Sequence, residues 1–295
     1  MFYDGNLPFK HYHMVTDCTK SGKNQVSGKP GQLLSKKILD VPTPEGFTSC
    51  YKPALNHSIY ALKSINQNID RPHMVLIHGA IVSRRYMIPT AIELGQSFNV
   101  IVPDLPGHGY SSKPVDALSV EEQAEAVRDW LRHNNIERTH LLANSYGCQI
   151  VMEIALRYPE VVESLTLVAT VADPAAPTIF EQAARLFFDG LFERPSLPFL
   201  VMRDMYDLGW KRAYQTARHM MDYPLKERAE RILTRSLVVR GGKDPLVSEK
   251  WAEIIAQSLP SGQFVSIAEA PHGVVYCNAE RLSEVVHQFI LPADG

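Results

Sequence analysis

The stretch that decides the fold is Thr139-His140-Leu141-Leu142-Ala143-Asn144-Ser145-Tyr146-Gly147-Cys148-Gln149-Ile150. Apolar residues lead up to Ser145, and helical periodicity begins at Ile150, which is typical of a buried strand that turns sharply into a helix. The small residues Ala143 and Gly147 let strand and helix approach closely, so that the turn points the serine outward. We therefore predict that Ser145 is a nucleophile at a strand-to-helix elbow.

Two further features bear on this interpretation. Ala143 stands where such elbows usually have glycine, but one extra methyl group is normally accommodated. The following helix would direct its free N–H groups and the positive end of its dipole at the Ser145 hydroxyl, where they stabilise developing negative charge. An ordinary strand-to-helix turn remains the alternative for this stretch alone, so the rest of the chain has to decide.

Composition limits the classes of function. The chain has 295 residues, 45% of them hydrophobic and 21% charged, which is enough for one large α/β core. A net charge of −2 gives no argument for nucleic acid, and no apolar run is long enough to span a membrane or to act as a signal peptide. The cysteines lack paired spacing, so we expect no disulfide and no zinc site, and a cytoplasmic location. They are Cys18, Cys50, Cys148 and Cys277.

The first part of the chain, residues 1–35, is polar and mildly basic and has no hydrophobic period. We interpret it as an N-terminal extension on the surface. A segment for oligomerisation or a lid is the alternative, so a homo-oligomer stays open.

From residue 36 onward, short apolar segments alternate with turns and helical patterns. Segments 38–41, 47–51 and 58–62 alternate in hydrophobicity between turn residues, which predicts antiparallel edge strands. Later apolar runs are typical of strands buried on both faces of a parallel sheet. They lie at 74–77, 100–103, 165–169, 236–240 and 264–267, in addition to the strand before Ser145. Intervening helical patterns at 87–94, and after the capping box at Ser119, predict helices on both faces.

Residues 172–232 interrupt this alternation, because they contain no convincing strand. Such a long excursion between two strands predicts a helical cap over the sheet. Apolar residues at helical spacing predict a packing face, formed by Phe180, Ala183, Ala184, Phe187, Phe188 and Leu191. Other cap residues are candidates for the pocket wall, namely Phe192, Phe199, Met202, Met205, Trp210 and Tyr214. The core would then comprise residues 36–171 and 233–295.

The order of the motifs at the strand ends resembles the α/β-hydrolase fold family over residues 36–291. These motifs are His78-Gly79, Asp104-Leu105-Pro106-Gly107-His108-Gly109, the Ser145 elbow, and then an acid and a histidine late in the chain. The resemblance implies an α/β fold with a mostly parallel central sheet flanked by helices and an inserted cap. It also implies a serine, a carboxylate and a histidine, in that order, on loops at the carboxyl edge of the sheet.

Candidates for the acid and the base follow from this order. Asp244 lies in a Gly-Gly-Lys-Asp-Pro turn directly after a strand and matches the family's acid turn, whereas Asp173 after the preceding strand is the competitor. Only His272 and His287 follow Asp244. His287 belongs to a helical pattern, so His272, in a loop after the last strand, is the predicted general base.

The resemblance also implies an oxyanion hole made of the backbone N–H groups of Ala80 and Tyr146. Near Ala80, we interpret Ser83, Arg84 and Arg85 as solvated surface, with contacts to an acidic substrate as the alternative. His78 and His108 in this family organise loops, and Cys148 and Cys277 are expected to be small buried hydrophobes. No metal or organic cofactor is indicated.

A serine at the elbow argues against the haloalkane dehalogenases and epoxide hydrolases of similar fold, which carry aspartate there. We expect a serine hydrolase that acts on a small-molecule substrate, a carboxylic ester, lactone or thioester of a small apolar acid. The carbon–carbon hydrolases that open ring-cleavage products are the alternative, although their glycine-rich oxyanion loop and the Trp after the catalytic histidine are missing at Ala80 and Gly273. A small-molecule receptor with this fold is a third hypothesis.

Overall fold

The computed structural model describes residues 43–65, 67, 68, 70–190 and 193–291. The predicted N-terminal extension 1–35, the predicted strand 38–41 and the pocket candidate Phe192 lie outside this range, as does Leu191.

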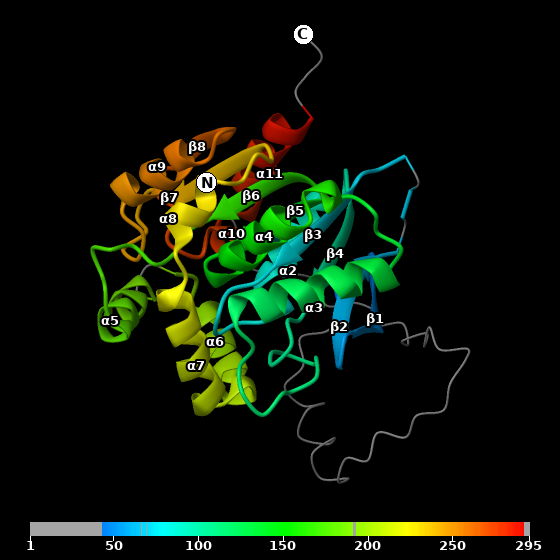
Figure 1. Cartoon of the computed structure of the whole chain (residues 1–295), viewed down its shortest axis with the longest axis horizontal. Coiled ribbons are helices and arrows are strands. Elements are labelled where there is room, and N and C mark those ends of the chain that lie inside the picture. The colour runs from blue at the N-terminus through cyan, green and yellow to red at the C-terminus, as the bar shows by residue number, and fades with distance from the viewer. Residues whose placement is uncertain (1–42, 66, 69, 191–192, 292–295) are drawn as a thin grey trace, which may run out of the picture.

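The described residues form an eight-stranded sheet in the order β1-β2-β4-β3-β5-β6-β7-β8 (Figure 1). β1 and β2 are antiparallel to each other, β2 is antiparallel to β4, and every other pair is parallel. The strands are β1 (Phe47–Ala54), β2 (His57–Ser64), β3 (His73–Ile77), β4 (Asn99–Pro103), β5 (Thr139–Asn144), β6 (Val162–Val168), β7 (Ser236–Gly241) and β8 (Gly262–Ile267). This confirms the predicted α/β class, with antiparallel strands at one edge of a mostly parallel sheet.

The central strands are apolar throughout because both faces of the sheet are covered. In β3, Val75 and Ile77 belong to one buried cluster, whereas Met74 and Leu76 belong to another. Successive side chains of a strand point to opposite faces, so the two clusters lie on opposite sides of the sheet. The uninterrupted runs in the sequence therefore predicted these strands correctly.

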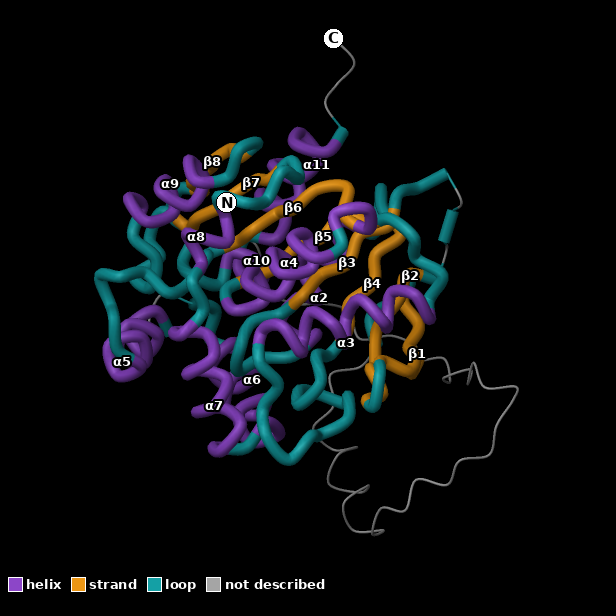
Figure 2. The backbone as a smooth tube through the Cα atoms, viewed as in Figure 1, coloured by secondary structure: helices purple, strands orange, loops and turns teal. Residues whose placement is uncertain are grey.

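Helices pack on both faces (Figure 2). Most of the helical residues of the first cluster come from α3 (Val120–His133), α4 (Tyr146–Arg157), α8 (Leu225–Ala229) and α9 (Glu249–Ser258). Most of those of the second come from α2 (Arg84–Leu94), α10 (Val274–Cys277) and α11 (Ala279–Ile290). A short 3₁₀ helix, η1 (Pro159–Val161), joins α4 to β6.

Helix starts follow the capping residues. Ser119 forms the predicted capping box with Glu122, each side chain bonding the other residue's backbone N–H. α2 begins three residues before the predicted start at residue 87, because the Ser83 hydroxyl accepts a hydrogen bond from the Arg85 N–H and acts as the N-cap.

Four helices occupy the chain between β6 and β7, and we call them the inserted helices. They are α5 (Ile179–Asp189), α6 (Ser196–Leu208), α7 (Trp210–Asp222) and α8. β6 and β7 are themselves paired neighbours in the sheet. Hydrogen bonds join the insertion to α4: Gln149 Nε2 donates to the Met220 carbonyl (2.9 Å), and the Tyr223 hydroxyl donates to Glu153 (3.0 Å).

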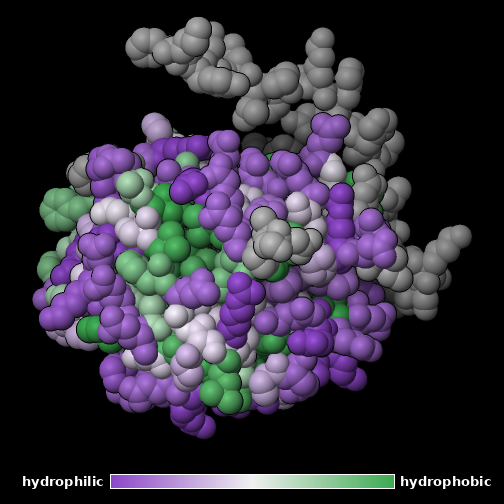
Figure 3. Space-filling view, turned by 90° about the horizontal axis from the view of Figure 1, so that it is seen from above, coloured by the Kyte–Doolittle hydropathy of each residue, from purple (hydrophilic) through white to green (hydrophobic). Residues whose placement is uncertain are grey.

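One prediction for the insertion was wrong. Three residues of the predicted packing face of α5 do not pack inward: Phe180, Phe187 and Phe188 are 82%, 74% and 58% exposed. The buried residues of this helix are instead Gln182 and Asp189, which hydrogen-bond the backbone of neighbouring loops. Figure 3 shows hydrophobic surface at its left margin, the side on which Figure 1 places α5. Other apolar residues of the insertion that are largely exposed are Phe199, Met202, Tyr206, Trp210 and Tyr214.

Among the described residues, no helix combines the length and the apolar character needed to cross a lipid bilayer.

Candidate active site

Ser145 occupies the corner between β5 and α4. Its backbone has φ 56° and ψ −123°, a conformation that side-chain-bearing residues rarely adopt and that the surrounding structure must enforce. The Ser145 N–H donates to the Val168 carbonyl (2.9 Å), which holds the corner against β6. A Cβ on Gly147 would lie only 2.6 Å from the His78 carbonyl oxygen and 2.8 Å from that of Ile77, so only glycine lets α4 approach β3 this closely. The predicted elbow is therefore present.

Asp244 and His272 are brought together from two different loops. His272 Nδ1 lies 2.9 Å from Asp244 Oδ2, and both residues are buried. The other oxygen of Asp244 accepts hydrogen bonds from the N–H groups of Leu246 (2.7 Å) and Val247 (3.1 Å). Both carboxylate oxygens thus have partners, which fix the acid in a position to orient the imidazole.

The turn that carries Asp244 is packed against residues 270–273, which we call the histidine loop. Lys243 N–H donates to the Ala270 carbonyl (2.9 Å). A side chain on Gly241 would collide with the carbonyl groups of Ala270 and Pro271, so this glycine permits the close approach. The acid and the histidine are therefore held by backbone contacts as well as by their own hydrogen bond.

The charges around His272 favour its protonated form. Burial lowers the pKa of the imidazole, but the charge and hydrogen bond of Asp244, together with the charges of Asp189 and Glu193, raise that pKa to about 9.

Asp173, the competing candidate for the acid, makes other contacts. Its Oδ1 accepts from the Ala175 N–H (2.9 Å) and its Oδ2 from the Ser248 N–H (2.9 Å), at the start of α9. The carboxylate thus closes its own turn and joins it to the loop before α9.

The loop after β3 runs beside the elbow. A Cβ on Gly79 would lie 3.4 Å from Ser145 Cβ, so Ala80 follows a residue in contact range of the serine. The Ala80 carbonyl is held by His108 Nε2 (2.7 Å). Tyr146 is the first residue of α4, where backbone N–H groups have no acceptor within the helix. The loop that carries Ala80 therefore passes the elbow, and Tyr146 follows Ser145 directly in the chain.

His78 and His108 organise these loops as expected. The Leu105 N–H donates to His78 Nε2 (3.0 Å), and His78 Nδ1 donates to the Gly79 carbonyl (2.8 Å). Burial lowers the pKa of His78 to about 4 and that of His108 to about 3, so both rings are neutral near pH 7.

The interpretation of Arg84 and Arg85 as solvated surface charges was wrong, because both are buried. Arg84 Nη1 lies 2.7 Å from Asp104 Oδ2, and its guanidinium stacks over Tyr60 and Tyr110. Arg85 Nη1 lies 3.0 Å from Asp204 Oδ1 on α6. The start of α2, capped by Ser83, places both side chains inside the protein. Arg84 there pairs with the core, and Arg85 joins the core to the inserted helices.

Sequence reasoning also missed three buried or half-buried acids. Asp104 accepts hydrogen bonds from Arg84 and from the Tyr110 N–H (2.8 Å), and its motif Asp-x-Pro-Gly-His-Gly was a usable signal, since a side chain on Gly109 would collide with this carboxylate. Asp189 and Glu193 of the insertion contact the histidine loop. Nothing in the sequence around these two acids pointed to that contact.

The cysteine interpretation is half correct. Cys148 is fully buried, whereas Cys277 is partly exposed and its thiol donates to Glu193 Oε2 (2.6 Å). Within the described ranges, no three His, Cys, Asp or Glu side chains come together in a way that could hold a metal ion.

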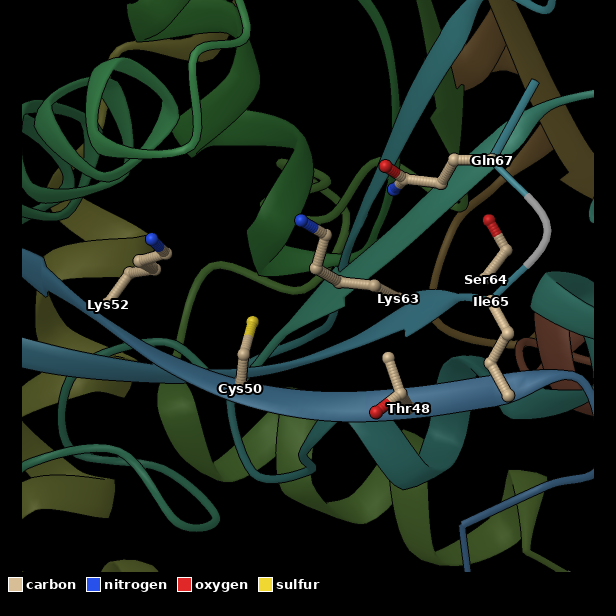
Figure 4. A pocket seen from close by; sticks show the side chains of 7 residues that line it. All are labelled: Thr48, Cys50, Lys52, Lys63, Ser64, Ile65 and Gln67. Atoms are coloured by element: carbon tan, nitrogen blue, oxygen red, sulfur yellow. The ribbon is translucent and has the colours of Figure 1, made fainter. Parts of the chain in front are cut away.

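A surface groove of about 280 Å³ lies at the other end of the sheet (Figure 4). Its wall is formed by Thr48, Cys50, Lys52, Lys63, Ser64, Ile65 and Gln67, from β1, β2 and the segment after β2. β4 and β3 separate these strands from β5, which carries Ser145, so the groove is not part of the candidate site.

Comparison with known proteins adds the following. The family described as "alpha/beta hydrolase fold" matches residues 72–204. Over 98 residues the chain is 38% identical to an uncharacterized protein of Mycobacterium tuberculosis, a match that covers 33% of this chain and 29% of that protein. It is 27% identical to a 2-hydroxymuconate semialdehyde hydrolase of Pseudomonas sp., covering 75% of this chain and 88% of the enzyme. It is also 27% identical to lipase 3 of Moraxella sp., covering 70% and 73%.

Solved structures agree with the fold. The crystal structure of a membrane phospholipase A, 24% identical, superposes with a TM-score of 0.72 over 83% of this chain and 86% of that one. The sheet order and these similarities show that the chain has the α/β-hydrolase fold.

Proposed function

We propose that the chain is a serine hydrolase that cleaves a carboxylic ester, lactone or thioester of a small apolar acid through an acyl-enzyme. Ser145 would be the nucleophile, His272 the general base and Asp244 the acid that orients it. The observation that carries this proposal is the 2.9 Å contact of His272 Nδ1 with Asp244 Oδ2, on loops of the same sheet that bears the strained Ser145 elbow.

The reaction follows from these roles. His272 Nε2 takes the proton of the Ser145 hydroxyl as its oxygen bonds to the acyl carbon, and the carbonyl oxygen becomes an oxyanion. The N–H groups of Ala80 and Tyr146 would donate to this oxyanion. The imidazolium then gives its proton to the leaving alcohol or thiol. Water, activated by His272, releases the acid and restores the serine.

The inserted helices would act as a cap that supplies part of the pocket wall. Leu197 of α6 belongs to the same buried cluster as Val274, two residues after His272, and Leu200 and Val201 pack against that cluster. Apolar side chains of the insertion so near the histidine support an apolar acyl group over a charged one.

The test is hydrolysis of p-nitrophenyl esters with acyl chains of increasing length. Turnover should depend on Ser145: Ser145→Ala should abolish it, and a fluorophosphonate should label Ser145 in the folded protein. Ser261→Ala, at an exposed serine, is the matched control and should change neither result. Labelling of a different serine, or turnover that survives Ser145→Ala, would contradict the proposal. Negligible turnover with tight binding of a small ligand would favour a receptor.

Carbon–carbon bond hydrolysis is the second candidate. The observation that favours it is the similarity to 2-hydroxymuconate semialdehyde hydrolase over most of both chains. A ring-cleavage product assayed beside the esters distinguishes the two, because the substrate with the higher kcat/KM names the reaction.

A further inference from the structure

The inserted helices carry a buried acid directly against the histidine loop. Asp189 ends α5, is 2% exposed, and accepts a hydrogen bond from the backbone N–H of His272 (3.0 Å). A buried carboxylate is costly unless its hydrogen bonds are satisfied, so this contact is specific rather than incidental.

A second acid of the insertion, Glu193, contacts the next residue of the histidine loop, Gly273. Glu193 Oε1 accepts from the Gly273 N–H (2.7 Å), and its Oε2 accepts from the Cys277 thiol (2.6 Å). The carboxylate of Glu193 lies so close to Gly273 that it would have to shift if this residue carried a side chain. Nearby, Arg194 Nη2 donates to the Cys277 carbonyl (3.0 Å).

We propose that Asp189 and Glu193 are positioning residues, which fasten the inserted helices to the histidine loop and hold His272 in register with Asp244. This role rests on the proposed function, since it is the geometry of a general base that they fix. Two consecutive backbone N–H groups, those of His272 and Gly273, are bound from the insertion, whereas the ring is bound from the core by Asp244. The histidine is thus clamped from both sides.

The same acids influence the charge on the imidazole. Asp189 and Glu193 both add to the effect of Asp244 in raising the pKa of His272. Tyr86 of α2 and Cys277 of α10 also lie at the cluster, and burial raises the pKa of each, so both stay neutral near pH 7. The guanidinium of Arg194 adds a positive charge beside Cys277. Burial also raises the pKa of Asp189. Removing the charge of Asp189 should therefore make His272 easier to deprotonate.

Two substitutions separate position from charge. Asp189→Asn keeps an oxygen that can accept from the His272 N–H but loses the charge, so kcat should stay near the native value while the acid limb of the kcat/KM profile moves to lower pH. Asp189→Ala loses the acceptor as well, and kcat should fall by up to about 100-fold, because small displacements of a catalytic group are costly. Glu193→Gln and Glu193→Ala should behave in the same way.

The matched control is Asp222→Asn and Asp222→Ala, at an exposed acid of α7, which should leave rate and pH profile unchanged. A readout without turnover is the low-field proton NMR signal of the His272 Nδ1–H bonded to Asp244, whose pH titration should shift downward in Asp189→Asn.

Unchanged kcat, pH profile and NMR titration in the Asp189 and Glu193 variants would overturn the clamp. If the native protein hydrolyses no ester, the proposed function fails, but the NMR titration still decides the clamp. If the alanine variants do not fold, the Asn and Gln variants decide it through the pH profile and the titration.

Discussion

The sheet core and the inserted helices use amphipathic sequence in opposite ways. In the core, most apolar residues are buried: Phe98, before β4, is 1% exposed. In α5 of the insertion, Phe188 is 58% exposed, whereas the polar Gln182 and Asp189 are buried. The helix is as regular in its pattern as those of the core, but its polar side faces the protein.

The difference shows that burial follows the chemistry of the surface against which an element packs. Core helices cover an apolar sheet, so their apolar side turns inward. α5 covers a loop whose backbone N–H groups need acceptors, and Asp189 supplies one at His272. The inward side of α5 therefore matches the polar backbone of the histidine loop rather than an apolar surface.

The largest effect on kcat is expected for the proposed catalytic acid of the core, Asp244. Asp244→Asn should lower kcat by about 10⁴-fold with the fold retained, because the histidine would lose the acceptor that fixes its tautomer. Ester hydrolysis and circular dichroism measure the two quantities. Asp173→Asn is the control. A larger loss of kcat in Asp173→Asn would identify Asp173, after β6, as the catalytic acid in place of Asp244.

A buried core side chain should come next. Phe98→Ala should lower the free energy of unfolding by about 3–5 kcal/mol, since it leaves a cavity between α2 and the sheet. Urea denaturation gives this value. If the free energy of unfolding fell only as much as in a surface substitution, the core around Phe98 would be less tightly packed than the low exposure of this side chain indicates.

The pH profile tests whether both regions act on the base. His272 must be neutral to accept the serine proton, and its pKa is raised to about 9. Activity should therefore rise with pH, and kcat/KM at pH 7 should be about 100-fold below its plateau above pH 9, tenfold for each pH unit. A profile that is flat between pH 7 and pH 9 would contradict the combined influence of Asp244, Asp189 and Glu193.

The smallest effect belongs to the exposed side of α5. Phe188→Ala should change the free energy of unfolding by no more than about 0.5 kcal/mol, because the ring is already largely in water. It is the matched partner of Phe98→Ala in the same urea experiment. A loss near that of Phe98→Ala would mean that the aromatic side of α5 is covered in solution.

The core could be predicted from the sequence because strands buried on both faces leave uninterrupted apolar runs. Met74 to Ile77 and Val100 to Val102 are such runs, and both are strands. Motifs at the strand ends then indicated Ser145, Asp244 and His272 as candidates, because each lies in a turn of recognisable composition. The contact between Asp244 and His272 was expected from the resemblance to the α/β-hydrolase family, which implies an acid and then a histidine in this order.

The errors arose where a side chain depends on partners far along the chain. Arg84 and Arg85 follow a loop and carry charge, which favours solvent, but Asp104 and Asp204 neutralise them inside the protein. In α5, the pattern gave the helix and its two sides correctly but not which side faces inward. That choice depends on the histidine loop, which lies more than eighty residues away in sequence.

The direct pairing of β6 with β7 has a consequence for how such enzymes diversify. All of α5 to α8 leaves the sheet after one strand and returns at its immediate neighbour, so the excursion contributes no strand and shifts no register. Recombination at these two points would move all four inserted helices between relatives in a single event. Only the hydrogen bonds from the insertion to the backbone of His272 and Gly273 would then have to form again. The ability to accept these two N–H groups would therefore decide which insertions the core can use.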